Sequence, residues 1–195
     1  TVVLIYGLEG SSDSGYMKGM TQTLLENGFN VCALNLRGCS GEDNLMLHTY
    51  HSGKIDDLHT VLRYLHQKGE EIVLAIGYSL GANLLLRYAG GPEYDNPMPK
   101  ALVAVSAPVD LAGSSRTLNG FHNRVYLWHF LRKLKKKARL KLKKFPEANL
   151  NPEKVLSSRN FYEFDDAFTA PVNGYAGAAD YYEQASALPH LKHIS

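Results

Sequence analysis

The stretch Ile72–Ala82, IVLAIGYSLGA, decides the fold. It begins with a short apolar run typical of a buried strand, passes through a G-x-S-x-G turn, and continues into an apolar segment with helical spacing. Gly77 and Gly81 stand two residues before and two after Ser79, where larger side chains would clash in a tight strand-to-helix turn. Such a turn exposes a hydroxyl and places the next backbone N–H at a helix N-terminus. The stretch therefore predicts Ser79 as a nucleophile and the N–H of Leu80 as an oxyanion donor.

Similar strand and helix patterns alternate over the first 110 residues. The predicted strands are Val2–Tyr6, Phe29–Leu36, Ile72–Ile76 and Ala101–Val105. The predicted helices between them are Ser11–Leu25, Ile55–Leu65 and Leu80–Tyr88. Short, continuously apolar strands that are separated by helices are typical of a parallel sheet covered on both faces. The sequence predicts an α/β fold.

The pattern changes after Asp110. Residues 113–165 contain no convincing strand, and a helix is predicted over 127–145, with apolar residues every three or four positions and basic residues at the others. We expect residues 1–112 to form the N-terminal part of an α/β core and residues 113–165 to form a helical cap or lid. The remaining residues, 166–195, are expected to return the chain to a C-terminal part of the core.

A second oxyanion donor normally comes from the loop after an earlier strand. The turn Tyr6–Gly10, YGLEG, follows the first predicted strand, and the N–H of Leu8 is the candidate donor. A glycine turn alone is an ordinary strand-to-helix connection, but its pairing with the G-x-S-x-G turn favours the oxyanion role.

Four ordered motifs resemble those of the YheT-type α/β-hydrolases, a group that also includes eukaryotic ABHD-type lipid hydrolases. They are Gly7–Ser12 (GLEGSS), Asn35–Gly41 (NLRGCSG), Tyr50–Gly53 (YHSG) and Gly77–Asn83 (GYSLGAN). Two later segments, Phe164–Pro171 (FDDAFTAP) and Tyr181–Tyr182, match further landmarks of the group. The resemblance implies a Ser-Asp-His hydrolase that acts on esters, with Ser79 as nucleophile and the N–H groups of Leu8 and Leu80 as oxyanion donors. The residue before Gly7 is often His in such hydrolases and is Tyr6 here, which we expect to alter packing more than chemistry.

The acid and the base of the triad follow the serine in chain order on this fold. The resemblance places both beyond Ser195. The candidates within the chain are Asp110 as acid and His190 or His193 as base, but neither histidine follows a recognisable final strand. The sequence favours a turn role for Asp110 and surface positions for the two histidines.

Other polar candidates have structural interpretations. His51 precedes the serine, against the order of the fold, so a loop role is favoured over a general base. Cys39 has no partner at metal-ligand spacing and is interpreted as a small buried thiol. The histidines show no metal-binding pattern, so no metal and no cofactor are expected.

Charge is unevenly distributed along the chain. Nine of the thirteen residues from Arg132 to Lys144 are Lys or Arg, so that segment carries +9, while the whole chain carries +2 and the remainder therefore −7. Three interpretations stay open for residues 127–145: a solvated outer helix face, an amphipathic helix on an anionic membrane, and a nucleic-acid contact. The last is not expected, because the basic run contains no interleaved aromatic residues.

Composition limits the class of protein. Apolar residues make up 45% and charged residues 21%, which is ordinary for a globular chain and argues against disorder. The two cysteines, the lack of a membrane-spanning run and the lack of a secretory leader predict a cytoplasmic location, with a membrane-peripheral location as the alternative.

The sequence therefore predicts a serine carboxylic-ester hydrolase, esterase-like or lipase-like, that acts on a small-molecule or lipid ester. Two alternatives are an acyltransferase that uses the same serine and a non-catalytic membrane-associated protein on a hydrolase fold. An intact strained serine turn argues against the second alternative.

Overall fold

The computed structural model describes residues 1–94 and 97–194. The chain forms two compact units. The first unit consists of Thr1–Asp43, Tyr50–Val109 and the segment from Ala185 onward, and the second consists of Asn44–Thr49 and Asp110–Gln184.

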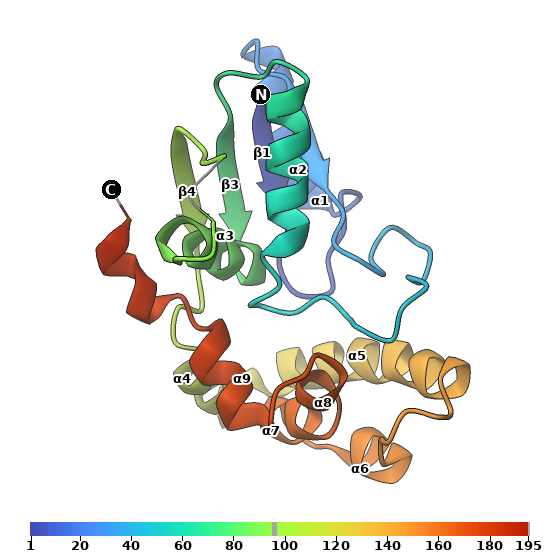
Figure 1. Ribbon diagram of the computed structural model, residues 1–195. Coiled ribbons are helices and arrows are strands. Elements are labelled where there is room, and N and C mark those ends of the chain that lie inside the picture. The colour runs from blue at the N-terminus through green and yellow to red at the C-terminus, as the bar shows by residue number, and fades with distance from the viewer. Residues whose placement is uncertain (95–96, 195) are drawn as a thin grey trace. The chain divides into compact units, whose positions relative to one another are not determined.

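The first unit is an α/β layer structure (Figure 1). Its elements in chain order are β1 (Val2–Ile5), α1 (Gly15–Glu26), β2 (Val31–Leu34), α2 (Asp56–Gln67), β3 (Leu74–Tyr78), α3 (Leu80–Gly90), β4 (Ala101–Val105) and the 3-10 helix η3 (Leu188–His193). The strands pair in the order β2-β1-β3-β4, and every pair is parallel. The predicted α/β class and the mostly parallel sheet are confirmed.

The core lies around β1, whose four residues are all buried because the strand has a partner on each side. In Figure 1, α2 and α3 lie in front of the sheet and α1 lies behind it, so both faces are covered. This arrangement explains why the strands are continuously apolar and do not alternate.

Two strands differ from their predicted bounds. The N–H of Phe29 donates to Leu24 at the end of α1, and the N–H of Leu36 donates to the hydroxyl of Tyr6, so β2 is shorter than predicted. β3 begins and ends two residues later than predicted, and the side chain of Ile72 is 63% exposed.

Within the described residues, β4 is an edge strand. It pairs with β3 alone, and Val103 and Val105 on it are exposed. An exposed apolar edge of this kind is a site for pairing with further strands.

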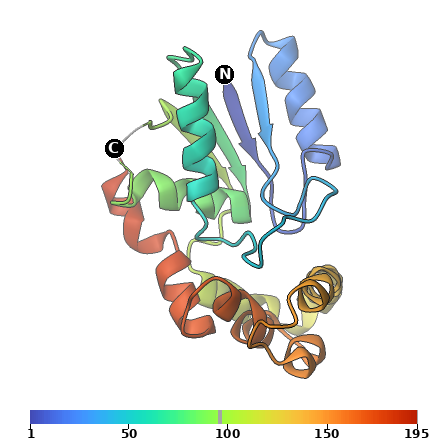
Figure 2. The same cartoon turned by 45° about the vertical axis from the view of Figure 1, so that its right-hand side comes forward.

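Every regular element that the structure describes in the second unit is helical (Figure 2). The elements are α4 (Leu111–Leu118), the 3-10 helix η1 (Phe121–Asn123), α5 (Arg124–Lys144), α6 (Pro152–Ser157), α7 (Phe161–Phe164), the π-helix η2 (Asp165–Thr169), α8 (Ala170–Val172) and α9 (Ala178–Ala185). The long basic helix was predicted over 127–145 and begins three residues earlier. Over the described residues, no helix is both long and apolar enough to span a bilayer.

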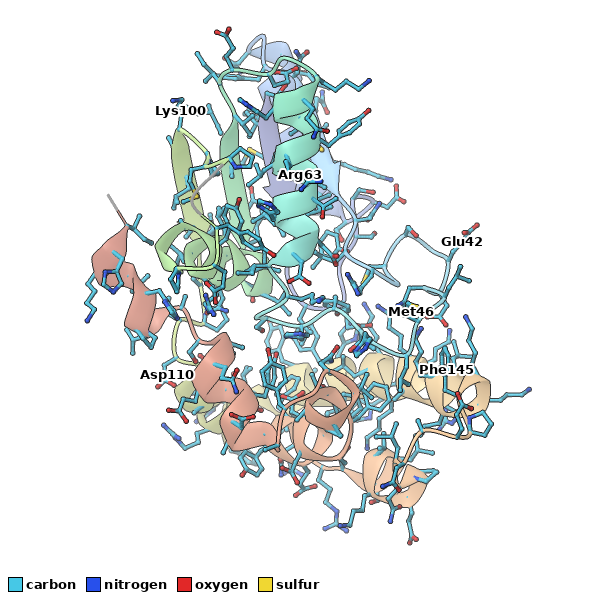
Figure 3. The ribbon with its side chains drawn as sticks, viewed as in Figure 1. Glu42, Met46, Arg63, Lys100, Asp110 and Phe145 are labelled. Atoms are coloured by element: carbon cyan, nitrogen blue, oxygen red, sulfur yellow. The ribbon has the colours of Figure 1, made fainter. Side chains whose placement is uncertain are left out.

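The expectation that basic residues of this helix avoid its buried face is wrong at Lys141. Its side chain is 2% exposed, and its ammonium donates to the carbonyl and side-chain oxygens of Asn44 and to the carbonyl oxygen of Met46, at 2.6–2.8 Å. Three oxygens replace the water that the ammonium loses, so the charge can be buried. Figure 3 labels Met46 and Phe145 beside this end of α5.

The segment Asn44–Thr49 belongs to the second unit because of such contacts. The side chain of Asn173 accepts from the N–H of Thr49 at 3.2 Å and donates to its hydroxyl at 3.1 Å. The second unit is thus wider than the helical segment of 113–165, and its role as a cap stays a prediction.

The segment after α9 packs on α3 within the first unit. The buried side chain of Asn83 donates to the carbonyls of Ser52 and Ala185 and accepts from the N–H of Ala187, at 2.9–3.1 Å. The N–H of Leu188 donates to the carbonyl of Val109 at 3.0 Å. A single amide side chain thus joins three segments of the core.

Candidate active site

Ser79 lies in a strained turn between β3 and α3. Its backbone has φ 49° and ψ −115°, a conformation that side-chain-bearing residues rarely adopt and that costs about 1–3 kcal/mol. The N–H of Ser79 donates to the carbonyl of Val105 at 2.8 Å, and its carbonyl accepts from Asn83 at 3.0 Å in the first turn of α3. These bonds hold the turn, and the side chain of Ser79 is exposed.

The glycines on either side of the turn are required by close backbone contacts. A Cβ at Gly77 would lie 2.5 Å from the carbonyl oxygen of Gly81. A Cβ at Gly81 would lie 2.5 Å and 2.6 Å from the carbonyl oxygens of Ile5 and Tyr6. Only glycine therefore lets the start of α3 approach both its own strand and the end of β1.

The loop after β1 lies against Ser79. A Cβ at Gly7 would lie 3.1 Å from the Cβ of Ser79 and 3.7 Å from its Oγ. The next N–H groups along the two segments are those of Leu8 and Leu80, and within the described part of the chain neither donates to a protein acceptor. Leu80 follows Ser79 directly, and Leu8 follows Gly7, which lies beside Ser79. Two N–H groups that converge beside a nucleophile can stabilise an oxyanion.

Tyr50 holds the turn that carries Leu8. The N–H of Gly10 donates to the carbonyl of Gly7 at 3.0 Å, and Glu9, in the third position of this turn, has φ 57°. The hydroxyl of Tyr50 accepts from the N–H of Glu9 at 2.9 Å and donates to its Oε1 at 2.6 Å. Burial and the nearby charge of Glu9 raise the pKa of Tyr50 well above its ordinary value, so the phenol keeps the proton that it donates.

Other side chains brace the same loop. The hydroxyl of Tyr16 accepts from the N–H of Gly7 at 3.0 Å, and the side-chain amide of Asn35 accepts from the N–H of Ser12 and donates to its hydroxyl, each at 2.9 Å. The fully buried hydroxyl of Tyr6 accepts from the N–H of Leu36 at 2.6 Å. Tyr6 therefore packs and bonds within the core.

The bracing roles of Tyr50 and Asn35 were not inferred from the sequence. Both stand in the quoted motifs, but their partners, Glu9 and Ser12, lie 41 and 23 residues away. The sequence signal that could have indicated these roles is a residue with hydrogen-bonding capacity, the hydroxyl of Tyr50 or the amide of Asn35, within a glycine-containing loop motif.

The histidines considered as bases within the chain lie far from Ser79. A Cβ at Gly90, the last residue of α3, would lie 2.2 Å from the carbonyl oxygen of His190, so His190 packs against that end of the helix. Ser79 caps the opposite end, and eleven helical residues span about 16 Å. Burial and the nearby Arg87 lower the pKa of His190. His193 belongs to the same short helix, η3.

Asp110 caps a helix. Its Oδ1 accepts from the N–H of Gly113 at 2.9 Å, at the start of α4, where Figure 3 labels it. This is the turn role that the sequence favours. Among the described residues, no side chain forms a hydrogen bond with the hydroxyl of Ser79.

His51 and Cys39 have local roles. His51 is buried, and its Nδ1 accepts from the N–H of Gly53 at 3.2 Å. Cys39 is buried beside the hydroxyl of Tyr6. Among the described residues, no group of three His, Cys, Asp or Glu side chains is arranged to hold a metal ion.

The second unit contains a carboxyl, that of Asp165, to which sequence reasoning assigned no role although it lies in the quoted segment Phe164–Pro171. The hydroxyl of Tyr182 donates to Oδ2 of Asp165 at 2.7 Å, and Oγ of Ser115 lies 3.3 Å from the same hydroxyl. Burial raises the pKa of Asp165 to about 6, against hydrogen bonds from Thr169 and Tyr182 that lower it. Asp165 begins the π-helix η2, a helix type that is uncommon in proteins.

Comparisons with known proteins agree with this geometry. The chain is 39% identical over its full length to "Putative esterase YheT" of Escherichia coli (strain K12), of which it covers 57%. It is 29% identical over its full length to the phospholipase ABHD3 of Homo sapiens and covers 47% of that protein. It is 27% identical over 99% of its length to the monoacylglycerol lipase of Saccharomyces cerevisiae, of which it covers 44%. The chain thus spans about half the length of these relatives.

A solved structure shares the fold. The Pyrococcus furiosus esterase Pf2001 aligns with 99% of this chain and 68% of its own chain, at a TM-score of 0.52 and 18% identity. The family described as the alpha/beta hydrolase fold matches residues 1–191, nearly the whole chain. The parallel sheet, the strained serine turn after β3 and this match together show that the chain belongs to the alpha/beta hydrolase fold family.

Proposed function

We propose that the chain carries the nucleophile and the oxyanion site of a serine carboxylic-ester hydrolase. The observation that carries the proposal is the strained, exposed Ser79, which lies beside two N–H groups without a protein acceptor in the described chain. Strained residues of this kind cluster at active sites. The names of the relatives, an esterase, a phospholipase and a lipase, support an ester as substrate.

The reaction follows from the positions of these groups. Oγ of Ser79 attacks the ester carbonyl as a base accepts its proton, and the N–H groups of Leu8 and Leu80 bind the oxyanion that forms. The intermediate collapses with breakage of the bond to the alcohol, which leaves with the proton from the base. Water, deprotonated by the same base, then attacks the acyl-enzyme and releases the carboxylic acid and Ser79.

The acid and the base are proposed to lie beyond Ser195. The support is that His190 and His193 lie at the far end of α3 from Ser79. The relatives are also about twice as long as this chain. All activity proposals therefore concern the complete protein.

The substrate is proposed to be a small-molecule or lipid ester, and the long basic helix is proposed to bring the protein to an anionic membrane. Val125, Tyr126 and Trp128 on α5 are exposed apolar residues beside the basic run. A basic helix with exposed aromatic and aliphatic side chains fits the interface of an anionic bilayer. Flotation with phosphatidylglycerol vesicles at low salt tests this contact, and a protein that stays unbound contradicts it.

Labelling with a fluorophosphonate tests the nucleophile. The complete protein is expected to be labelled, and the Ser79→Ala variant is expected to lose the label. Ser106→Ala is the matched control, because Ser106 is another exposed serine with positive φ (53°) that follows a strand. Undiminished labelling of a folded Ser79→Ala variant would place the nucleophile elsewhere. Product analysis with an added alcohol distinguishes hydrolysis from acyl transfer.

A further inference from the structure

We propose that a hollow on α5 is a binding site for one anionic phospholipid molecule. The hollow has a volume of about 490 Å³ and is formed by one face of α5 together with the link between α6 and α7, all within the second unit. A volume of this size is typical of small-molecule sites. The inference deepens the membrane contact proposed above and does not depend on the chemistry of Ser79.

Much of the lining of the hollow is positively charged. Five cationic side chains line it: Arg124, Arg132, Lys135, Arg139 and Arg159. Within the described residues, none of the five forms an ion pair. Five like charges around one hollow repel one another, so a bound anion would relieve that repulsion.

The link is held in place by bonds that leave the guanidinium of Arg159 available. The ammonium of Lys135 donates to the carbonyl of Ser158, and the backbone N–H of Arg159 donates to Glu163 at 2.6 Å. Glu163 is the acidic group that faces Lys135, and it also accepts from the side chain of Asn160 at 2.7 Å. Its carboxylate is therefore engaged in closing the link.

Three apolar side chains also line the hollow: Leu127, Trp128 and Leu131. Leu131 follows Leu127 by four residues and Trp128 by three, so it neighbours both on the surface of α5. The indole of Trp128 is 61% exposed, and the guanidinium of Arg132 lies over it at 5.5 Å. Free phosphate would use only the cationic side chains, whereas a phospholipid would place its phosphate on the guanidinium groups and its first acyl carbons on the apolar side chains.

The positions of the cations allow a specific binding site to be distinguished from general electrostatic attraction to the helix. Lys133 and Lys136 stand on the same helix, are exposed and do not line the hollow. A purely electrostatic attraction would treat all these cations alike, at about 1 kcal/mol for each charge near the surface. A built site depends on Arg139 and Arg159 much more than on Lys133 and Lys136.

The test measures binding of a soluble short-chain phosphatidylglycerol to the complete protein, alone and in competition with inorganic phosphate. Arg139→Gln with Arg159→Gln should weaken binding by about tenfold or more, since two charge-assisted contacts are lost. Lys133→Gln with Lys136→Gln, which changes the charge equally, should leave binding within about twofold at moderate salt because screening weakens contributions from outside the site. Trp128→Ala should weaken lipid binding without altering phosphate binding.

Three other outcomes would each contradict one part of the proposal. Equal loss in both double variants would overturn the site and leave a diffuse membrane contact. Phosphate that binds as tightly as the lipid would overturn the lipid assignment. No binding to phosphatidylglycerol, soluble or in vesicles, would overturn both the site and the membrane contact, whereas labelling at Ser79 would still test the proposed hydrolase separately. Thermal unfolding of each variant shows whether a loss reflects misfolding.

Discussion

Replacement of Tyr50 by Phe should impair catalysis, although the hydroxyl that it removes bonds to Glu9 and not to Ser79. Tyr50→Phe deletes the oxygen that accepts from the N–H of Glu9 and donates to its carboxylate. Tyr50 is buried and Glu9 is half-buried, so water would only partly replace the partner that the N–H of Glu9 loses. An unsatisfied donor of this kind costs about 1–3 kcal/mol.

That cost acts on a turn that is already strained. Glu9 has φ 57°, and the turn can relax toward an ordinary conformation once Tyr50 no longer holds it. Relaxation would move the N–H of Leu8 away from Ser79, and a misplacement of about 1 Å can cost about 10²-fold in rate. We therefore expect kcat to fall by about 10²-fold, with little change in KM, because an oxyanion contact forms only in the transition state.

The assay is steady-state hydrolysis of a short activated ester by the complete protein. Tyr64→Phe is the matched control, since Tyr64 lies on α2 with 56% of its surface exposed and, in the described structure, its hydroxyl forms no hydrogen bond. A folded Tyr50→Phe variant with the kcat of the wild type would refute the positioning role. A rise in KM alone would show that Tyr50 shapes substrate binding and not the oxyanion site.

Three further predictions concern stability, and urea unfolding checks each one. Ser79→Gly should be more stable than Ser79→Ala by about 1 kcal/mol, because glycine adopts φ 49° without strain; equal stability would contradict the strain. Gly81→Ala should cost about 3 kcal/mol or more, since its Cβ would meet two carbonyl oxygens, whereas Gly19→Ala in α1, with open space around it, should gain up to about 1 kcal/mol. The raised pKa of Asp165 makes its contribution to stability full below its ordinary pKa of 3.8 and lost as pH rises through about 6. Asp165→Asn should remove this loss, and an unchanged pH profile between 4 and 7 would show that the carboxyl is not desolvated.

The elbow could be predicted because its determinants are local. Eleven consecutive residues contain the strand, the two glycines, the serine and the start of the helix, and the clashes that require glycine involve the backbone itself. The parallel sheet followed from the same kind of local pattern, repeated four times. The end of β2 and the start of β3 did not, because the bond of Leu36 to Tyr6, 30 residues away, and the exposure of Ile72 depend on tertiary structure.

The periodic pattern of apolar and basic residues did not predict that the charge of Lys141 is buried against a distant segment. Lys141 occupies a position that the basic run marks as exposed, and its partners are Asn44 and Met46, 95–97 residues away. The same limit explains Tyr50 and Glu9. Sequence spacing predicts which face a residue occupies, but it does not predict which distant oxygen will satisfy a buried donor.

The most direct test of the account is to trap the acyl-enzyme. The complete protein is mixed with an ester that acylates the enzyme faster than the acyl-enzyme is hydrolysed. The reaction is quenched with acid, the protein is digested, and the masses of the peptides are measured by mass spectrometry. We expect the peptide that contains Ser79 to gain the mass of the acyl group, and Ser79→Ala to show neither the adduct nor turnover. An acyl adduct on another residue, or full turnover by Ser79→Ala, would contradict the account.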